Sequence, residues 1–164
     1  MKRRTMMNFS IGLTVLVILL ASIGIVHYRD DSFPFRCTTF SRYDLTIKER
    51  EHLVFTVTQD LRFQNHHSGY LLLNGQVTRG GVTTLLNRRI NLITGDKIDY
   101  DTYRYRISGI VKSLTDNTPD KAFNMLLAEL TLGPFYLQLE VMKVDDKDYL
   151  VGGPLSDLFI CRRY

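Results

Sequence analysis

The sequence predicts a mainly β protein with one late helix, held outside the cytoplasm by an N-terminal transmembrane helix. Three observations predict this class: a long uncharged run near the start of the chain, strand-like alternation over most of the rest, and two cysteines far apart in that rest. We divide the chain into a cytoplasmic tip at 1–8, a membrane anchor at 9–28 and an outer β domain at 29–164.

The predicted anchor rests on residues 9–26, which carry no charge and are rich in Leu, Ile and Val. As a helix this run spans roughly 27 Å, close to the hydrocarbon thickness of a bilayer. Lys2, Arg3 and Arg4 precede it, so the positive-inside rule places the N-terminus in the cytoplasm and the β domain outside. A signal peptide cleaved after Gly24 is the alternative, although the apolar region of such peptides usually has about 7–15 residues.

Cys37 and Cys161 are the two cysteines of the chain, and both lie after the anchor. An even number of cysteines in an oxidising compartment predicts a disulfide. The bridge would join residues 124 positions apart, which in the chain-entropy account stabilises a fold by about 4–5 kcal/mol. It also requires the first and last strands to be neighbours, as in a closed or nearly closed sheet. Two free buried thiols are the alternative.

Apolar and polar residues alternate with strand period through most of the outer domain. The predicted strands are 52–64 with a break after Thr58, 70–77, 82–94, 100–111, 135–142, 149–151 and 158–161. Short turns connect them, including 79–81, 94–97 and 145–148. Successive antiparallel strands with short turns predict a meander of six or seven strands that curls into a barrel.

Residues 118–130 break the strand period and predict one helix packed on the barrel. Thr118 is a suitable N-cap and Pro119 suits the first helical position. One apolar stripe then follows at helical spacing: Phe123, Leu126, Leu127 and Leu130.

Charge and motifs exclude several function classes. Of 21 Lys and Arg residues, three stand at positions 2–4, and the other 18 nearly balance 17 Asp and Glu, so the domain has no electrostatic footprint for nucleic acid. His66 and His67 lie in a polar stretch that reads as a solvated turn, with no third ligand spaced for zinc. The sequence lacks a nucleophile elbow, a phosphate loop and a zinc-protease helix. We therefore expect no enzymatic activity, no catalytic residue, no metal and no cofactor.

Arg88, Tyr103 and Tyr105 are the candidate ligand-binding residues, as parts of a pocket wall for an amphipathic anion. The two tyrosines alternate with Arg104 and Arg106 along one predicted strand. The alternative is that one face of this strand is ordinary core and the other carries solvated cations.

Several short motifs resemble the FidL-like inner-membrane proteins of enterobacteria. They are a cysteine soon after an uncleaved anchor, Asn87–Arg88 in a mid-domain strand, Pro119–Asp120 at the start of the late helix, the run Tyr-Leu-Val-Gly-Gly-Pro at 149–154, and Phe-Ile-Cys at 159–161. Such proteins are typically encoded beside a membrane-spanning, ToxR-like transcription regulator.

The resemblance, extended by analogy with ToxS, implies a single-pass protein of the bacterial inner membrane with a periplasmic domain. That domain would bind and tune the periplasmic domain of a ToxR-like regulator. The implied fold is a lipocalin-like barrel built partly with the partner, with a pocket for a bile-salt-like effector. The alternative function is a free-standing envelope protein that binds a lipid or peptide in its own barrel.

Overall fold

The computed structural model describes residues 14–22, 33–48, 51–131, 133, 135–153 and 157–164. The chain divides into two compact units, Met1–Phe33 and Pro34–Tyr164. In the first unit residues 14–22 form a helix, and the rest of the predicted anchor at 9–28 lies outside the described residues. Within the described ranges, no helix is both long enough and apolar enough to cross a membrane.

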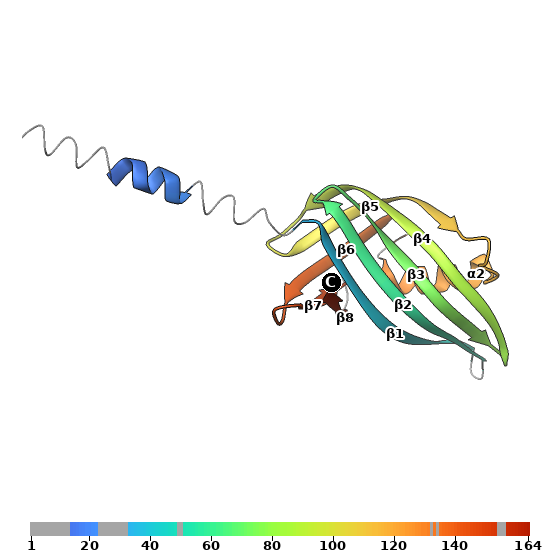
Figure 1. The fold of residues 1–164 in the computed structure, drawn as a ribbon. Helices are drawn as coiled ribbons and strands as arrows, with labels where there is room; N and C mark the ends of the chain where they lie inside the picture. The colour runs from blue at the N-terminus through green and yellow to red at the C-terminus, as the bar shows by residue number, and fades with distance from the viewer. Residues whose placement is uncertain (1–13, 23–32, 49–50, 132, 134, 154–156) are drawn as a thin grey trace, which may run out of the picture. The chain divides into compact units, whose positions relative to one another are not determined.

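The second unit is a closed antiparallel barrel with one helix, as the meander pattern predicted (Figure 1). The elements are β1 (Phe35–Lys48), β2 (Glu51–Asn65), β3 (Ser68–Arg79), β4 (Val82–Lys97), β5 (Thr102–Lys112), α2 (Asp120–Leu130), β6 (Tyr136–Lys143), β7 (Asp148–Gly152) and β8 (Asp157–Arg163). Each strand pairs with the next in the chain, and β8 returns to pair with β1.

The barrel has eight strands, so the prediction of six or seven was wrong. The missing strand is β1, which pairs with β2 from Phe35 opposite Phe63 to Lys48 opposite Glu51. Thr39, Ser41 and Tyr43 occupy the same face of β1 as the buried Phe35 and Cys37. Because polar residues take half of these inner positions, the apolar alternation that marks a strand is weak in β1.

The predicted break after Thr58 was also wrong, because β2 is continuous and Gln59 takes an inward, buried position in it. The neighbouring strand β3 passes straight through Gly75. A Cβ atom at Gly75 would stand 2.1 Å from the Thr56 carbonyl oxygen, so only glycine allows β3 to approach β2 this closely.

The turn predicted at 94–97 was misplaced by a few residues. β4 passes a bulge between Ile93 and Asp96 and ends at Lys97, so the turn to β5 is 98–101. Thr94 adopts a left-handed backbone with φ 48° at this bulge. A bulge keeps the strand paired beyond the turn-like residues, which the local sequence pattern did not predict.

The interior of the barrel is filled by large side chains from the strands and from α2. The apolar face of α2 is buried as predicted, with Ala122 added to the stripe, and Figure 1 shows the helix behind β3 and β4. The predicted Thr118 cap was wrong, because no side chain caps the helix. The Thr118 hydroxyl instead donates to the Leu85 carbonyl at 2.9 Å and so ties the start of α2 to β4.

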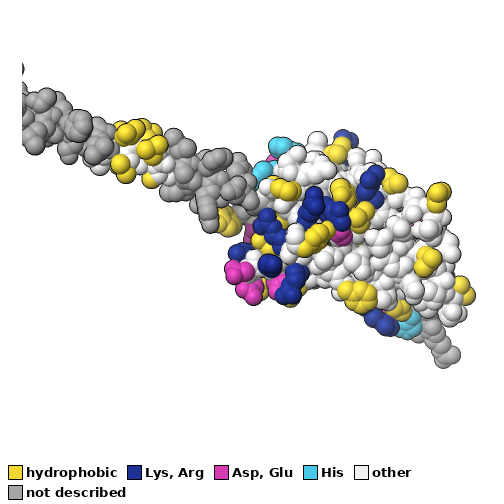
Figure 2. All heavy atoms as spheres, viewed as in Figure 1, with side chains coloured by type: hydrophobic (Ala, Val, Ile, Leu, Met, Phe, Trp, Pro, Cys, Tyr) yellow, Lys and Arg dark blue, Asp and Glu magenta, His cyan; other side chains and the backbone are white. Residues whose placement is uncertain are grey.

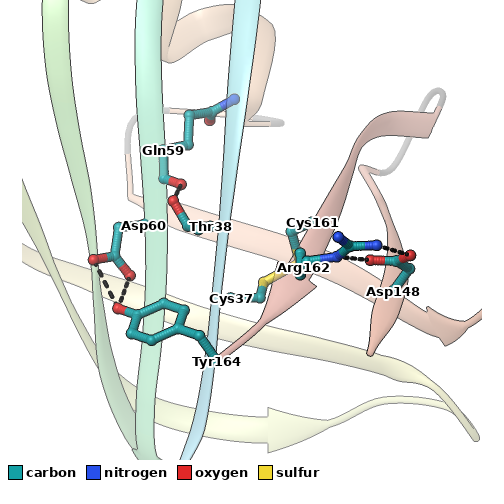
Figure 3. Close-up of a disulfide and its surroundings, with 8 residues drawn as sticks. All are labelled: Cys37, Thr38, Gln59, Asp60, Asp148, Cys161, Arg162 and Tyr164. Carbon is teal, nitrogen blue, oxygen red and sulfur yellow. Dashed lines mark hydrogen bonds and ion pairs between the residues drawn. A yellow bond between two sulfur atoms is a disulfide. The ribbon is translucent and has the colours of Figure 1, made fainter. Parts of the chain in front are cut away.

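A disulfide between Cys37 and Cys161 joins β1 to β8, which confirms the predicted pairing (Figure 3). Both cysteines are buried, at 0% and 1% exposure. The ladder between these strands has only two residue pairs, Cys37 with Arg163 and Thr38 with Arg162. We call these two pairs and the bridge the seam. Beside the seam, the Tyr164 hydroxyl donates to the Asp60 carboxylate at 2.9 Å and reaches across β1 to β2.

Candidate binding site

The three predicted ligand-binding residues do not meet in the fold. Arg88 stands opposite Lys112 and Tyr103 stands opposite Lys97, so they lie at opposite ends of the ladder between β4 and β5. Tyr105 points inward and stacks on Phe63, with 4.7 Å between the ring centroids. Burial, helped by the neighbouring Tyr103, raises the pKa of the Tyr105 phenol, so it stays protonated in the core. A ligand-binding role for these residues stays a prediction.

Arg88 lies inside the fold, at 4% exposure, where its guanidinium links β4 to the start of α2. Its Nε donates to Asp116 Oδ2 at 3.0 Å and its Nη2 donates to the Thr118 carbonyl at 2.7 Å. Its Nη1 lies 2.9 Å from Asp120 Oδ1. The guanidinium carbon stands 4.4 Å from the centroid of the Phe123 ring. These contacts give Arg88 a structural role whatever else it does.

The carboxylate of Asp116 is the buried partner of this arginine, with 0% side-chain exposure. Burial, the largest single influence, raises the pKa of Asp116. The hydrogen bonds from Arg88 and from the Asn87 N–H, together with the charges of Arg88 and Lys112, outweigh burial and hold the pKa below its usual value. Asp116 is therefore charged in the folded protein at neutral pH.

The lowered pKa of Asp116 predicts acid sensitivity. Because the folded pKa lies below the unfolded one, the stabilising contribution is fully present above the unfolded value of about 3.9 and is lost as the pH falls towards the folded value. We expect Asp116→Asn to lose less stability than the wild type between about pH 5 and pH 2. Urea unfolding across this range measures the difference, and identical pH profiles for the two proteins would contradict the prediction.

One side of the barrel is incompletely paired. β1 pairs with β2 along its length but with β8 only at Cys37 and Thr38. From Thr39 to Lys48, the side of β1 away from β2 therefore has no β partner among the described residues, and we call this side the open edge. Across the gap the described pairing of β5 with β6 ends at Arg106, and one further hydrogen bond joins the Ile107 N–H to the Phe135 carbonyl. At the end where α2 lies, the described residues thus form a sheet of five strands, β1 to β5, with no strand paired to its outer edges.

Next to the open edge, three polar side chains form a cluster on the inner face of β1 and β2. The Gln59 amide donates to Ser41 Oγ at 3.0 Å and to the Tyr43 hydroxyl at 2.7 Å. Gln59 is 1% exposed, and its Oε1 has no hydrogen-bond partner in the part of the chain described here. Burial raises the pKa of Tyr43, against the lowering effect of its hydrogen bonds to Gln59 and Ser41.

The free end of this amide is unusual. Whichever end of the Gln59 amide faces the two hydroxyls, the other end is left without a partner. An unsatisfied buried polar group costs about 1–3 kcal/mol. Buried polar groups in native proteins are nearly always paired, so Gln59 Oε1 is a position where a bound water or a further partner would gain a hydrogen bond.

Sequence reasoning missed both features of this side. The signal for Gln59 was a polar residue at an inward position between Val57 and Leu61, which we interpreted as a break in the strand. The open edge gave no signal, because it depends on where β8 leaves β1. Among the described residues there is no group of three potential metal ligands.

The fold and the open edge define a disulfide-closed β-barrel domain with one side available for pairing. Residues 75–161, from the middle of β3 to the bridge cysteine of β8, match the family described as FidL-like putative membrane protein. The chain belongs to this family. No curated protein matches the sequence.

Proposed function

We propose that this chain is a membrane-anchored periplasmic accessory protein, without enzymatic activity, that binds and tunes a membrane-bound transcription regulator. The observation that carries the proposal is the open edge. An unpaired strand offers a row of backbone N–H and C=O groups, and extended segments of partner proteins bind such edges by adding a strand. A segment of the regulator's periplasmic domain would pair with Thr39–Lys48 in this way.

The open edge favours a protein partner over the alternative of a lipid or peptide held within the chain's own barrel. The barrel interior is occupied by side chains with almost no exposure, among them Phe55, Tyr105 and Phe123. A ligand cavity inside the separate chain would compete with this packing. An amphipathic effector, such as a bile salt, would bind beside the open edge in the complex, where the partner adds a wall.

The mechanism is stabilisation by binding. In this proposal the outer domain passes information laterally to another membrane protein. A partner that binds only the folded regulator raises the amount of folded regulator by mass action. An effector that binds the complex better than the separate domains strengthens that coupling.

Deleting residues 30–164 should lower the abundance and output of a ToxR-like regulator expressed from a foreign promoter. Phe40→Asp should do the same more weakly, because Phe40 lies on β1 beside the open edge with 69% exposure. The matched control is Val144→Asp, which changes an equally apolar residue with 59% exposure in the turn between β6 and β7. Immunoblots and a target-promoter reporter, with and without bile salts, provide the readouts.

Two results would count against the proposal. Unchanged regulator abundance and output after the deletion would favour the free-standing envelope protein. Equal effects of Phe40→Asp and Val144→Asp would show that the open edge is not the binding surface.

A further inference from the structure

Five arginines lie on the outer face of adjacent strands of the barrel. Pairing places Arg36 of β1 opposite Arg62 of β2, which stands opposite Tyr70 of β3. Arg89 of β4 stands opposite Leu72 of β3, one outward position along from Tyr70. Arg106 of β5 faces Tyr136 of β6, and Arg104 is the next outward residue on β5. Opposite residues share a face of the sheet, so these arginines all lie on the outer wall of the barrel, from β1 round to β5. We call Arg36, Arg62, Arg89, Arg104 and Arg106 the arginine belt.

Most of the belt has no acidic partner. Arg62 pairs with Asp60, but the other four arginines have no carboxylate within 4.0 Å among the described residues, and all four are exposed. Three arginines of the belt have aromatic neighbours. The guanidinium groups of Arg62 and Arg89 each stand 5.9 Å from the Tyr70 ring centroid. The guanidinium group of Arg104 stands 5.9 Å from the Tyr136 ring centroid. Figure 2 shows Lys and Arg side chains gathered on the visible face of the barrel.

Barrel stability explains only part of this arrangement, because Arg62 pairs with Asp60 and the exposed Asp96 stands opposite Arg104, whereas Arg36, Arg89 and Arg106 have no such neighbour among the described residues. Arg36 stands directly opposite Arg62, and like charges in this position destabilise a sheet. The outer domain is close to neutral, so the excess of positive charge here is local. The cations of the belt are all arginine, whereas lysines lie elsewhere, for example in α2 and in the turn before β7.

We propose that the arginine belt binds a carboxylate-rich surface of the regulator's periplasmic domain. Guanidinium groups hold carboxylates through two parallel hydrogen bonds, and arginine and tyrosine are the residues most enriched among the strong contacts of protein interfaces. The belt continues into the open edge, because Phe40 lies on the same outer face of β1 as Arg36. This inference rests on the proposed function and extends its interface from the strand edge to the wall of the barrel.

A membrane surface is the competing occupant, and the experiment below distinguishes it from a protein. The chain enters the barrel at the start of β1, and the turns at this end carry carboxylates at Asp99, Asp101, Asp145 and Asp146. Lys97, Lys143 and Lys147 lie beside them, so this end is close to neutral and offers an anionic lipid surface little attraction. The belt lies on the side wall, where a protein alongside reaches it.

The test measures binding of the full chain, in zwitterionic nanodiscs, to the purified periplasmic domain of a ToxR-like regulator from the same genome. Arg89→Glu combined with Arg106→Glu reverses two exposed belt charges. The control, Lys121→Glu with Lys147→Glu, makes the same change of charge in α2 and in the turn before β7. We expect the belt variant to raise the Kd at least about 30-fold and the control less than about twofold. Raising NaCl from about 50 to 300 mM should weaken the wild type more than the belt variant.

The outcomes separate the two proposals. If the wild type binds and the belt variant binds equally well, the belt is not part of the interface, while the proposed function stands. If the wild type does not bind at all, both proposals fail. If the belt variant keeps regulator binding and instead loses binding to vesicles containing phosphatidylglycerol, the belt is a lipid-binding surface. Thermal unfolding of each variant confirms that the fold is retained.

Discussion

Replacing Cys161 with Ser should lower the free energy of unfolding by about 4–5 kcal/mol, the largest effect we expect from one substitution. The bridge closes a loop of 124 positions, and opening so long a loop restores much conformational freedom to the unfolded chain. The backbone ladder of the seam has two residue pairs among the described residues, and the Tyr164 N–H adds one hydrogen bond to the Arg36 carbonyl, so the bridge is the only covalent link in a short contact between β1 and β8. Guanidinium chloride unfolding of the full chain measures the loss, and reduction of the wild type should reproduce it.

The control removes a neighbouring contact that is not covalent. Arg162→Ala deletes the ion pair with Asp148, in which the Arg162 side chain is 71% exposed. An exposed pair of this kind contributes little to stability, so this variant should unfold close to the wild type. Equal stability of Cys161→Ser and the wild type would contradict the expectation. So would quantitative labelling of both cysteines in the native, unreduced protein.

Replacing Arg88 with Met should lower the free energy of unfolding by about 3–5 kcal/mol. The substitution leaves the Asp116 carboxylate without its main partner at a position where the side chain has no exposure. It also removes the donor to the Thr118 carbonyl at the start of α2. Urea unfolding measures the change, and cleavage by a protease near residue 118 should become faster because the start of α2 keeps only its Thr118 hydrogen bonds to β4.

A double-mutant cycle separates the charge from the packing. Because removal of both partners leaves no buried charge, Arg88→Met with Asp116→Leu should be more stable than Arg88→Met alone. Asp120→Asn is the control, since Asp120 contacts the same guanidinium but is 74% exposed and should change stability by less than about 1 kcal/mol. Additive effects at Arg88 and Asp116 would contradict a coupled buried pair.

Local patterns predicted the β class, α2 and the disulfide because each depends on neighbouring residues or on two cysteines alone. The stripe from Phe123 to Leu130 has helical period, and the buried face of α2 contains it. β1 escaped prediction because its inner face mixes Cys37 with hydroxyl-bearing residues such as Ser41. Those hydroxyls accept hydrogen bonds from Gln59, which is distant in the sequence.

The candidate site could not be predicted for the same reason. An open edge depends on two strands and on the residue at which they stop pairing. The sequence of β1 or of β8 alone does not contain this information. The ligand-binding role predicted for Arg88 stays a prediction, and its contacts with Asp116 and Asp120 come from the loop before α2 and from its first turn. A single strand pattern could not distinguish an arginine facing a ligand from one facing a buried carboxylate.

The position of the disulfide has a consequence for the biogenesis of the protein. Its sulfurs come from the first and last strands of the barrel, so the bridge cannot form until β8 has been synthesised. Both cysteines are inaccessible once the interior is packed, so an oxidant must act before packing is complete. Closure through contacts this distant in sequence is intrinsically slow. The newly made chain therefore passes through a stage with separated β1 and β8 edges and reduced thiols.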